Sequence, residues 1–195
     1  MSKINGIYAA SVSILDENLK LDIHKTIRHA ENLIKSGCHG VVIFGSTGQS
    51  QLISLEEKFE LIQNISKSIF KDKFIIGTGL NSLQDTISLI KISNSYNFNN
   101  FLIMPPAYYM YEDKDVIRFY IKLIEKLSNC KIILYNFEKL SGYKFSKESV
   151  EKLVSLFPEN IIGVKDSSYN LFESLNIENF SVLPGSELKL LKGLE

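Results

Sequence analysis

The stretch that decides the fold is Ile161-Ile162-Gly163-Val164-Lys165-Asp166-Ser167-Ser168, a short apolar run that ends abruptly in charged and polar residues. Continuous apolar runs of this length are typical of strands buried on both faces of a parallel sheet. A lysine rarely ends such a strand, because burying an ammonium group is unfavourable unless the amine loses its charge. Lys165 is therefore either a strand-end lysine whose head reaches water or an amine placed to attack a carbonyl group.

Similar apolar runs recur at intervals of about 20 to 33 residues, which is the length of one strand-plus-helix unit. Amphipathic helical stripes lie in the gaps, at residues 23–34, 55–69 and 116–127, and a last helix begins near Glu187. Ser54 with Glu57 predicts a capping box at the start of the second stripe. The sequence predicts strands at residues 7–10, 41–44, 74–77, 101–104, 132–135, 161–164 and 181–184.

Strands that alternate with helices predict an α/β fold with a parallel sheet and helices packed outside it. Two architectures fit this pattern, an open doubly wound sheet and an eight-stranded (β/α) barrel. Seven strands are visible in the 195 residues, whereas a complete barrel runs to roughly 250 residues. We therefore expect either an open sheet or a barrel that is incomplete within this sequence.

Composition excludes several classes of partner. The 22 basic and 22 acidic residues cancel, so nothing indicates binding to nucleic acid or to an anionic membrane, and no apolar run approaches the length of a membrane span. The two isolated cysteines, Cys38 and Cys130, fit no metal spacing and suggest reduced thiols in a cytoplasmic protein. The carboxylates show no paired metal-ligand pattern, and we expect His24, His29 and His39 to be structural or surface residues.

Two motifs with chemical potential follow other predicted strands. Gly45-Ser46-Thr47-Gly48-Gln49 is either a cradle for a carboxylate or phosphate, built from hydroxyls and backbone N–H groups, or an ordinary strand-to-helix turn. Tyr135-Asn136 ends the strand one unit before Lys165, where a phenol could move protons or simply fill the core. Because parallel strands end at one edge of the sheet, these motifs are candidates for one shared site.

Two further loops follow strands at the same predicted edge. Pro105-Pro106-Ala107-Tyr108-Tyr109 is a stiff loop with tyrosines at its tip, which suits either a site wall or an interface. Gly185-Ser186-Glu187 could bind substrate hydroxyls, or merely cap the helix that follows.

Taken together and in this order, the motifs at Gly45–Gln49, Tyr135-Asn136 and Gly163–Ser168 resemble those of the dihydrodipicolinate synthase and N-acetylneuraminate lyase family of Schiff-base aldolases. The resemblance runs from Gly6 to Glu195. It implies a TIM (β/α)8 barrel, truncated here after about seven strands. Residues 1–195 would then form the barrel domain, without the C-terminal end of the barrel or the helices that follow it. It also implies a homo-oligomer, a dimer or tetramer, when the protein is full length, and no metal or organic cofactor.

The resemblance assigns roles to individual residues. Lys165 matches the lysine that forms an imine with pyruvate or another 2-oxo acid, and Tyr135 matches the tyrosine that relays protons. Ser46 and Thr47 match the pair that holds the substrate carboxylate, and Thr47 also joins the relay. Tyr108 matches a tyrosine that enters the site of the neighbouring subunit. The residues that contact the rest of the substrate in the lyase branch are matched by Ser167, Gly185 and Glu187.

Departures from the family pattern bear on the reaction. Leu140 stands where true synthases keep an arginine for the carboxylate of the second substrate, a bond worth roughly 1.5–3 kcal/mol. Glu138 replaces a common proline, and Gln49 a common glutamate. The stretch Leu140-Ser141-Gly142 is more similar to the neuraminate lyase and 2-keto-3-deoxy-sugar-acid aldolase branches.

We therefore expect a lyase or aldolase that makes or breaks a C–C bond in a small-molecule 2-oxo acid. A 4-hydroxy-tetrahydrodipicolinate synthase is the main alternative. A phosphate-handling α/β enzyme, which would use the Gly45–Gly48 turn as its anion loop, and a non-catalytic relic that binds a 2-oxo acid or phosphate stay open.

Overall fold

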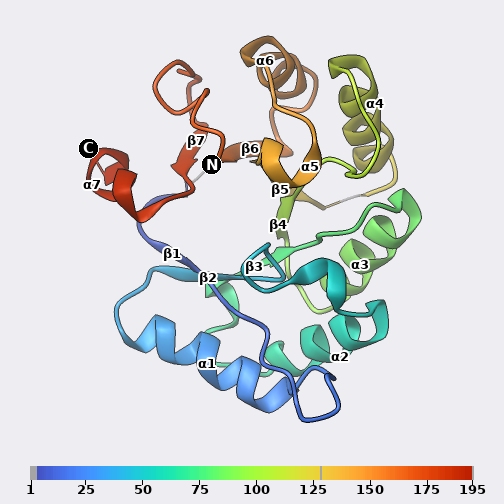
Figure 1. Cartoon of the computed structure of the whole chain (residues 1–195), viewed down its shortest axis with the longest axis vertical. Coiled ribbons are helices and arrows are strands. Elements are labelled where there is room, and N and C mark those ends of the chain that lie inside the picture. The colour runs from blue at the N-terminus through green and yellow to red at the C-terminus, as the bar shows by residue number, and fades with distance from the viewer. Residues whose placement is uncertain (1–3, 128, 195) are drawn as a thin grey trace. The chain divides into compact units, whose positions relative to one another are not determined.

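The computed structural model describes residues 4–127 and 129–194, which divide into two compact units (Figure 1). One unit comprises Gly6–Leu102, and the other comprises Ile103–Glu195 with the N-terminal residues that precede Gly6. Each unit repeats the strand-then-helix pattern that the sequence predicts.

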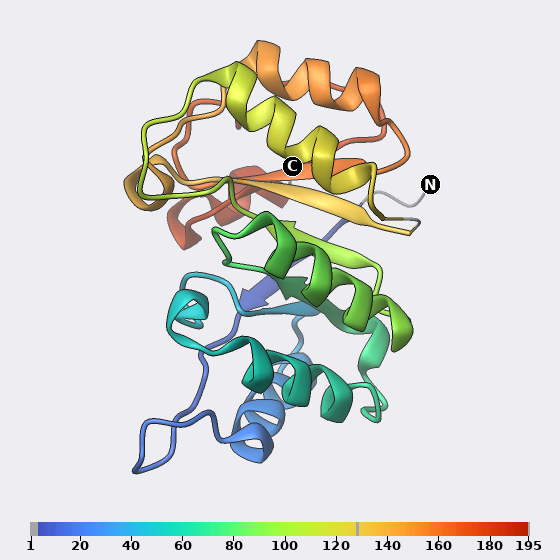
Figure 2. The ribbon, with the colours of Figure 1, turned by 90° about the vertical axis from the view of Figure 1, so that its right-hand side faces the viewer.

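The Gly6–Leu102 unit is built on parallel strands that pair in chain order. Helices α1, α2 and α3 lie side by side along these strands (Figure 2). The strands are β1 (Tyr8–Ala10), β2 (Gly40–Ile43), β3 (Phe74–Gly77) and β4 (Asn100–Ile103), of which the last residue belongs to the other unit. The helices are α1 (Ile23–Lys35), α2 (Leu55–Ile65) and α3 (Leu83–Ser95), with short 3-10 turns η1 (Ser50–Leu52) and η2 (Lys71–Lys73).

The Ile103–Glu195 unit contains a second run of parallel strands. Its two longest helices, α4 and α6, pack against each other (Figure 1). The strands are β5 (Lys131–Asn136), β6 (Ile161–Asp166) and β7 (Ser181–Pro184), paired in that order. The helical segments are α4 (Asp113–Ile124), α5 (Glu138–Ser141), α6 (Lys147–Leu156), η3 (Glu187–Lys189) and α7 (Leu190–Leu194).

Burial of the strands explains why their sequences are continuously apolar. Every residue of β2 and β3 is buried, and so is every residue of β5 from Ile132 to Asn136. A strand covered on both faces has no solvent-facing positions that would favour polar residues. All seven predicted strands are therefore confirmed within one or two residues at each end.

The predicted helices are present, but two of them end before their apolar stripes do. The stripe at residues 116–127 corresponds to α4, which begins at Asp113 and ends at Ile124. Ser54 and Glu57 form the reciprocal capping box expected at the start of α2. The stripe extended to Ile69, but α2 ends at Ile65 and Ile69 is 90% exposed. Ser68 gives the physical reason, because its hydroxyl accepts a hydrogen bond from the Phe70 N–H and donates one to Glu31, in competition with the helical pattern.

Candidate active site

The pairing of β5 with β6 places Tyr135 opposite Lys165. The two residues are register partners at the C-terminal ends of their strands, and the Lys165 Nζ lies 4.6 Å from the centre of the Tyr135 ring. Tyr135 is buried, whereas Lys165 is half-buried. The amine is therefore directed onto the face of the phenol ring, and the predicted proximity of these two residues is confirmed.

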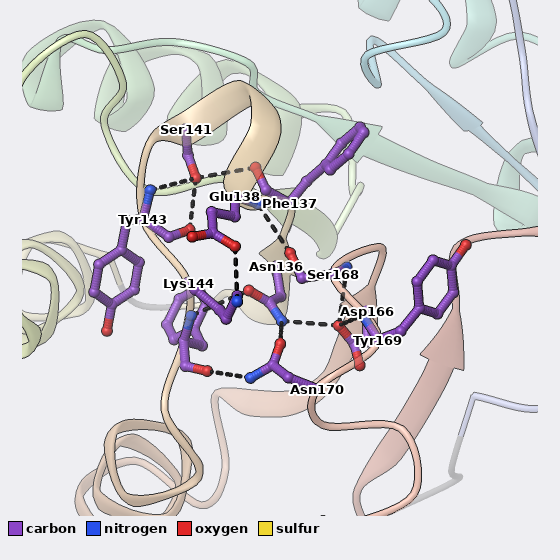
Figure 3. A network of polar contacts seen from close by, with 11 residues as sticks. Asn136, Phe137, Glu138, Ser141, Tyr143, Lys144, Asp166, Ser168, Tyr169 and Asn170 are labelled. Atoms are coloured by element: carbon purple, nitrogen blue, oxygen red, sulfur yellow. Dashed lines mark hydrogen bonds and ion pairs between the residues drawn. The ribbon is translucent and has the colours of Figure 1, made fainter.

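The next register pair, Asn136 and Asp166, is the centre of a polar network (Figure 3). The Asn136 Nδ2 donates to the Asp166 Oδ1 and to the Asn170 Oδ1, both at 2.8 Å, and its Oδ1 accepts from the Phe145 N–H at 3.1 Å. These three bonds use both N–H donors and the carbonyl oxygen of one buried amide. This amide therefore links the ends of β5 and β6 directly beside the Tyr135 and Lys165 pair.

Asp166 is fully buried, and backbone donors surround its carboxylate. It accepts hydrogen bonds from the backbone N–H groups of Ser168, Tyr169, Leu171 and Phe172, at 3.2, 2.9, 2.8 and 2.8 Å. A buried carboxylate is tolerated only when donors replace its lost water, and these four do so together with Asn136. The carboxylate thereby fixes the loop that follows Lys165.

The same network holds the short helix α5. The Ser168 hydroxyl accepts from the Glu138 N–H at 2.9 Å, and Glu138 pairs with Lys144 at 2.9 Å (Figure 3). Leu140 lies on this helix with 45% of its surface exposed. Helix α5 thus carries an accessible apolar side chain at this position.

The turn Gly45–Gln49 lies in the Gly6–Leu102 unit, directly after β2. Its flanks are strained, because Phe44 and Gln49 both adopt left-handed backbone angles, with φ of 54° and 49°. The turn is closed by hydrogen bonds from the Gln49 N–H to the Ser46 oxygen at 3.0 Å and from the Ser50 N–H to the Gly45 oxygen at 3.3 Å. A side chain at Gly48 would clash, since an added Cβ would lie 2.9 Å from the Ser11 oxygen.

The burial of one lysine in this unit was not predicted from the sequence. Lys58, on α2, is fully buried, and its Nζ donates to the Thr78 carbonyl oxygen at 3.2 Å. Burial lowers the pKa of the Lys58 amine to about 8, and the nearby charge of Asp85 opposes that shift in part. A signal was present in the sequence, because Lys58 shares the helical face of the buried residues Leu61, Ile62 and Ile65.

The remaining predicted site residues lie in the Ile103–Glu195 unit. Ser167 and Gly185 lie side by side, since a Cβ at Gly185 would collide with the Ser167 hydroxyl. Backbone bonds from Ser167 to the Asn136 oxygen (2.8 Å) and from Gly185 to the Asp166 oxygen (3.0 Å) hold both residues just beyond the ends of β5, β6 and β7.

Tyr108 and Glu187 are both exposed, and Tyr108, with 88% of its surface exposed, adopts a φ of 84°. Glu187 begins η3, where the Ser186 side chain accepts from the Leu188 N–H. Ser46 and Thr47 belong to the other unit, so their role beside Lys165 stays a prediction.

Within residues 4–127 and 129–194, no group of three or more His, Cys, Asp or Glu side chains could hold a metal ion. The helices in this part of the chain include none that is long and apolar enough to cross a membrane. His24 and His39 are exposed and His29 is half-buried, and the His39 Nδ1 accepts a hydrogen bond from the Ile7 N–H.

Comparisons with known proteins agree with one another. The model of the dihydrodipicolinate synthetase family matches residues 3–195. A 4-hydroxy-tetrahydrodipicolinate synthase of Karelsulcia muelleri is 29% identical over 178 residues, which cover 90% of this chain and 59% of that protein. One of Listeria monocytogenes serotype 4b is 34% identical over 158 residues, covering 80% of this chain and 52% of that protein. The chain thus spans just over half the length of these curated relatives.

Solved structures identify the fold. The crystal structure of dihydrodipicolinate synthase from Agrobacterium tumefaciens superposes with a TM-score of 0.89 at 25% identity, covering 97% of this chain and 69% of that one. The chain therefore has the (β/α)-barrel fold of that family, with seven of its strands in the described residues. Of the two architectures that the sequence allowed, the open doubly wound sheet is excluded.

Proposed function

Because the chain belongs to the dihydrodipicolinate synthetase family, we propose that Lys165 forms a Schiff base with a 2-oxo acid such as pyruvate, and that the protein is a class I aldolase or lyase. The observation that carries this proposal is the placement of the Lys165 amine 4.6 Å from the Tyr135 ring, at the paired ends of β6 and β5. An amine with a phenol beside it supplies a nucleophile and a proton-transfer group for imine formation.

The reaction follows from the chemistry of the amine. The neutral amine of Lys165 attacks the C2 carbonyl carbon, and the resulting carbinolamine loses its hydroxyl group as water once that group is protonated. The product is a protonated imine, which withdraws electrons from C3. When C4 carries a hydroxyl group, loss of its proton lets the C3–C4 bond break, which releases C4 as an aldehyde and leaves an enamine. In the reverse direction the enamine adds to an aldehyde, whose oxygen takes up a proton. Tyr135 moves the protons in both directions.

Substrate binding falls to the surrounding loops. Ser46 and Thr47 hold the carboxylate through hydroxyls and backbone N–H groups of their turn, and Thr47 joins the proton relay. Ser167, Gly185 and Glu187 contact the remainder of the substrate. Tyr108 reaches the site of a second copy in a dimer or tetramer, a role that suits its exposed position.

The second substrate distinguishes two candidate reactions. Leu140 offers no positive charge to an aldehyde that carries a carboxylate, and its half-exposed apolar side chain supports cleavage of N-acetylneuraminate or of 2-keto-3-deoxy sugar acids. The names of the Karelsulcia and Listeria relatives favour the other candidate, 4-hydroxy-tetrahydrodipicolinate synthase.

A substrate comparison tests the proposal. The protein is incubated with N-acetylneuraminate and with a panel of 2-keto-3-deoxy sugar acids, and pyruvate release is measured. In parallel it is given pyruvate with the aldehyde substrate of the synthase, and pyruvate consumption is followed. We expect release in the first assay and little consumption in the second. Consumption without release would assign the synthase reaction, and Leu140→Arg should then raise it further. Activity in neither assay would contradict the proposal.

A further inference from the structure

The Lys58 amine is a buried cation to which the proposed mechanism assigns no task. None of its side-chain surface is exposed, and no carboxylate of residues 4–127 or 129–194 lies within ion-pair distance of its Nζ. Burying a lysine without a paired charge is unfavourable, whereas methionine would fill a similar volume without that penalty. The contacts of the amine must therefore offset the unfavourable burial of the lysine.

Two donors converge on one carbonyl group. The Lys58 Nζ donates to the Thr78 backbone oxygen at 3.2 Å, and the Ser50 hydroxyl donates to the same oxygen at 3.1 Å. Thr78 follows β3 directly, and its own N–H is fixed by a bond to the Leu102 oxygen at 3.1 Å. The carbonyl is therefore a rigid anchor to which both α2 and the end of the Gly45–Ser50 turn are attached.

The same amine also contacts the beginning of that turn. Its Nζ lies 5.8 Å from the centre of the Phe44 ring, and Phe44 is the residue that enters the turn with a φ of 54°. Gln49, at the other end, has a φ of 49° and immediately precedes Ser50. Left-handed angles at non-glycine residues persist only where the surroundings enforce them. Lys58 contacts the entry of this strained turn directly and its exit through Thr78 and Ser50.

We propose that Lys58 is a positioning residue that holds the Gly45–Ser50 turn in the shape that binds the substrate carboxylate. That Lys58 holds the turn follows from its contacts. The effect of the turn on carboxylate binding rests on the proposed function of Ser46 and Thr47. Lys58 acts through Phe44 and the Thr78 carbonyl, and it does not itself contact the substrate.

The test compares Lys58→Met with two matched controls in the whole protein. Lys58→Met keeps a long apolar side chain and removes the donor. Ile62→Val alters an equally buried residue on the same helix, and Thr78→Val removes a hydroxyl while it keeps the carbonyl that Lys58 uses. We expect Lys58→Met to raise the KM for the 2-oxo acid about five- to tenfold with kcat within about twofold, the signature of binding energy lost equally from the ground state and the transition state. Both controls should leave KM unchanged.

Hydrogen exchange supplies a readout that does not depend on activity. The amides of Gln49 and Ser50 are hydrogen-bonded within the turn, and in Lys58→Met they should exchange at least about tenfold faster than in the wild type. Amides of the neighbouring strand β3 should not change. A purely structural role would instead speed exchange throughout α2 and β3, as a stronger packing defect on that helix would do.

The outcomes separate the two proposals. If the wild type forms no adduct with any 2-oxo acid, the proposed function fails. Faster exchange confined to the turn in Lys58→Met would still support the role of Lys58 in holding the turn. If the exchange of the turn amides and the KM are both unchanged in Lys58→Met, Lys58 does not hold the turn, whichever reaction the protein catalyses. Should Lys58→Met not fold, Ser50→Ala removes the other donor to the same carbonyl, and unchanged exchange at Gln49 in that variant would equally refute this role.

Discussion

Lys165 presents its amine to the face of the Tyr135 ring, with the Nζ 4.6 Å from the ring centre. An aromatic face stabilises a cation by about 0.5–2 kcal/mol, depending on desolvation. In the proposed reaction the amine becomes a protonated imine, which is a cation at almost the same position. The ring would therefore stabilise that intermediate, while the hydroxyl of the same residue would relay the protons.

Tyr135→Phe separates these two contributions. The ring stays under the amine, but the proton donor is lost, so we expect imine formation with pyruvate to slow by about 10²–10⁴-fold in a folded protein. The rate of the borohydride-trapped adduct, followed by mass spectrometry, measures this. Tyr120→Phe is the matched control, because its hydroxyl donates to the Ile103 oxygen in the same unit, at 2.7 Å. Equal trapping rates in Tyr135→Phe and wild type would exclude the relay.

Asn136→Ala should destabilise the protein markedly. The change leaves the buried Asp166 carboxylate short of one donor and leaves the Phe145 N–H without its acceptor. Orphaned buried polar groups cost about 1–3 kcal/mol each, so we expect a loss of roughly 2–4 kcal/mol in the free energy of unfolding. Urea denaturation measures it. A loss below about 1 kcal/mol would mean that the network in Figure 3 contributes little.

Lys58 predicts a specific pH dependence of stability. Its pKa is lowered from 10.5 to about 8 in the folded chain, so between these values the unfolded chain binds the extra proton. The free energy of unfolding must then rise with pH across this window, by up to about 3 kcal/mol from this residue. Urea denaturation at pH 7.5 and pH 10 of the wild type and of Lys58→Met isolates the effect. A constant difference between the two proteins would contradict it.

Thr78→Val should be nearly neutral. The Thr78 hydroxyl oxygen is buried and lacks a hydrogen-bond partner among the described residues, so its removal breaks no bond. We expect a change in unfolding free energy within about 0.5 kcal/mol, whereas Ser50→Ala, which loses a bond to the Thr78 oxygen, should lose about 1 kcal/mol. Thermal unfolding compares the two. A strong loss in Thr78→Val would show that the hydroxyl has a partner of its own.

The two cysteines should react differently. Burial raises the pKa of the Cys130 thiol to about 12, whereas Cys38 is half-buried. Since the thiolate is the reactive form, a thiol reagent at pH 8 should label Cys38 in the folded protein and Cys130 only after unfolding. Mass spectrometry counts the labels with and without denaturant. Rapid labelling of Cys130 under native conditions would indicate local opening of β5, which begins at the next residue.

Much of this site could be predicted because parallel strands impose simple rules. The apolar runs located all seven strands, and their order along the chain predicted that Tyr135 and Lys165 lie at the ends of adjacent strands. Asp166 lies within the Gly163–Ser168 motif, but the sequence does not predict its role. The donors it accepts come from backbone groups of a loop whose path no local pattern reveals.

Lys58 shows a different limit. Charged residues on a helix are normally assigned to the solvent side, so the burial of Lys58 was not predicted although it shares the apolar face of α2. Its amine is buried where it donates to the Thr78 carbonyl oxygen, just after β3. This is a tertiary contact between residues 20 positions apart, which no local pattern reveals. The prediction that α2 extends to Ile69 was wrong for the opposite reason. A serine hydroxyl competes with the helical hydrogen bonds before the apolar stripe ends.

The most direct test is reduction of the imine. The protein is treated with pyruvate and sodium borohydride, digested and mapped by mass spectrometry, alongside Lys165→Arg and Lys58→Met. The account predicts one reduced pyruvate adduct per chain, located at Lys165, retained in Lys58→Met at saturating pyruvate and lost in Lys165→Arg. An adduct at any other lysine, or none at Lys165 in the folded wild type, would contradict it.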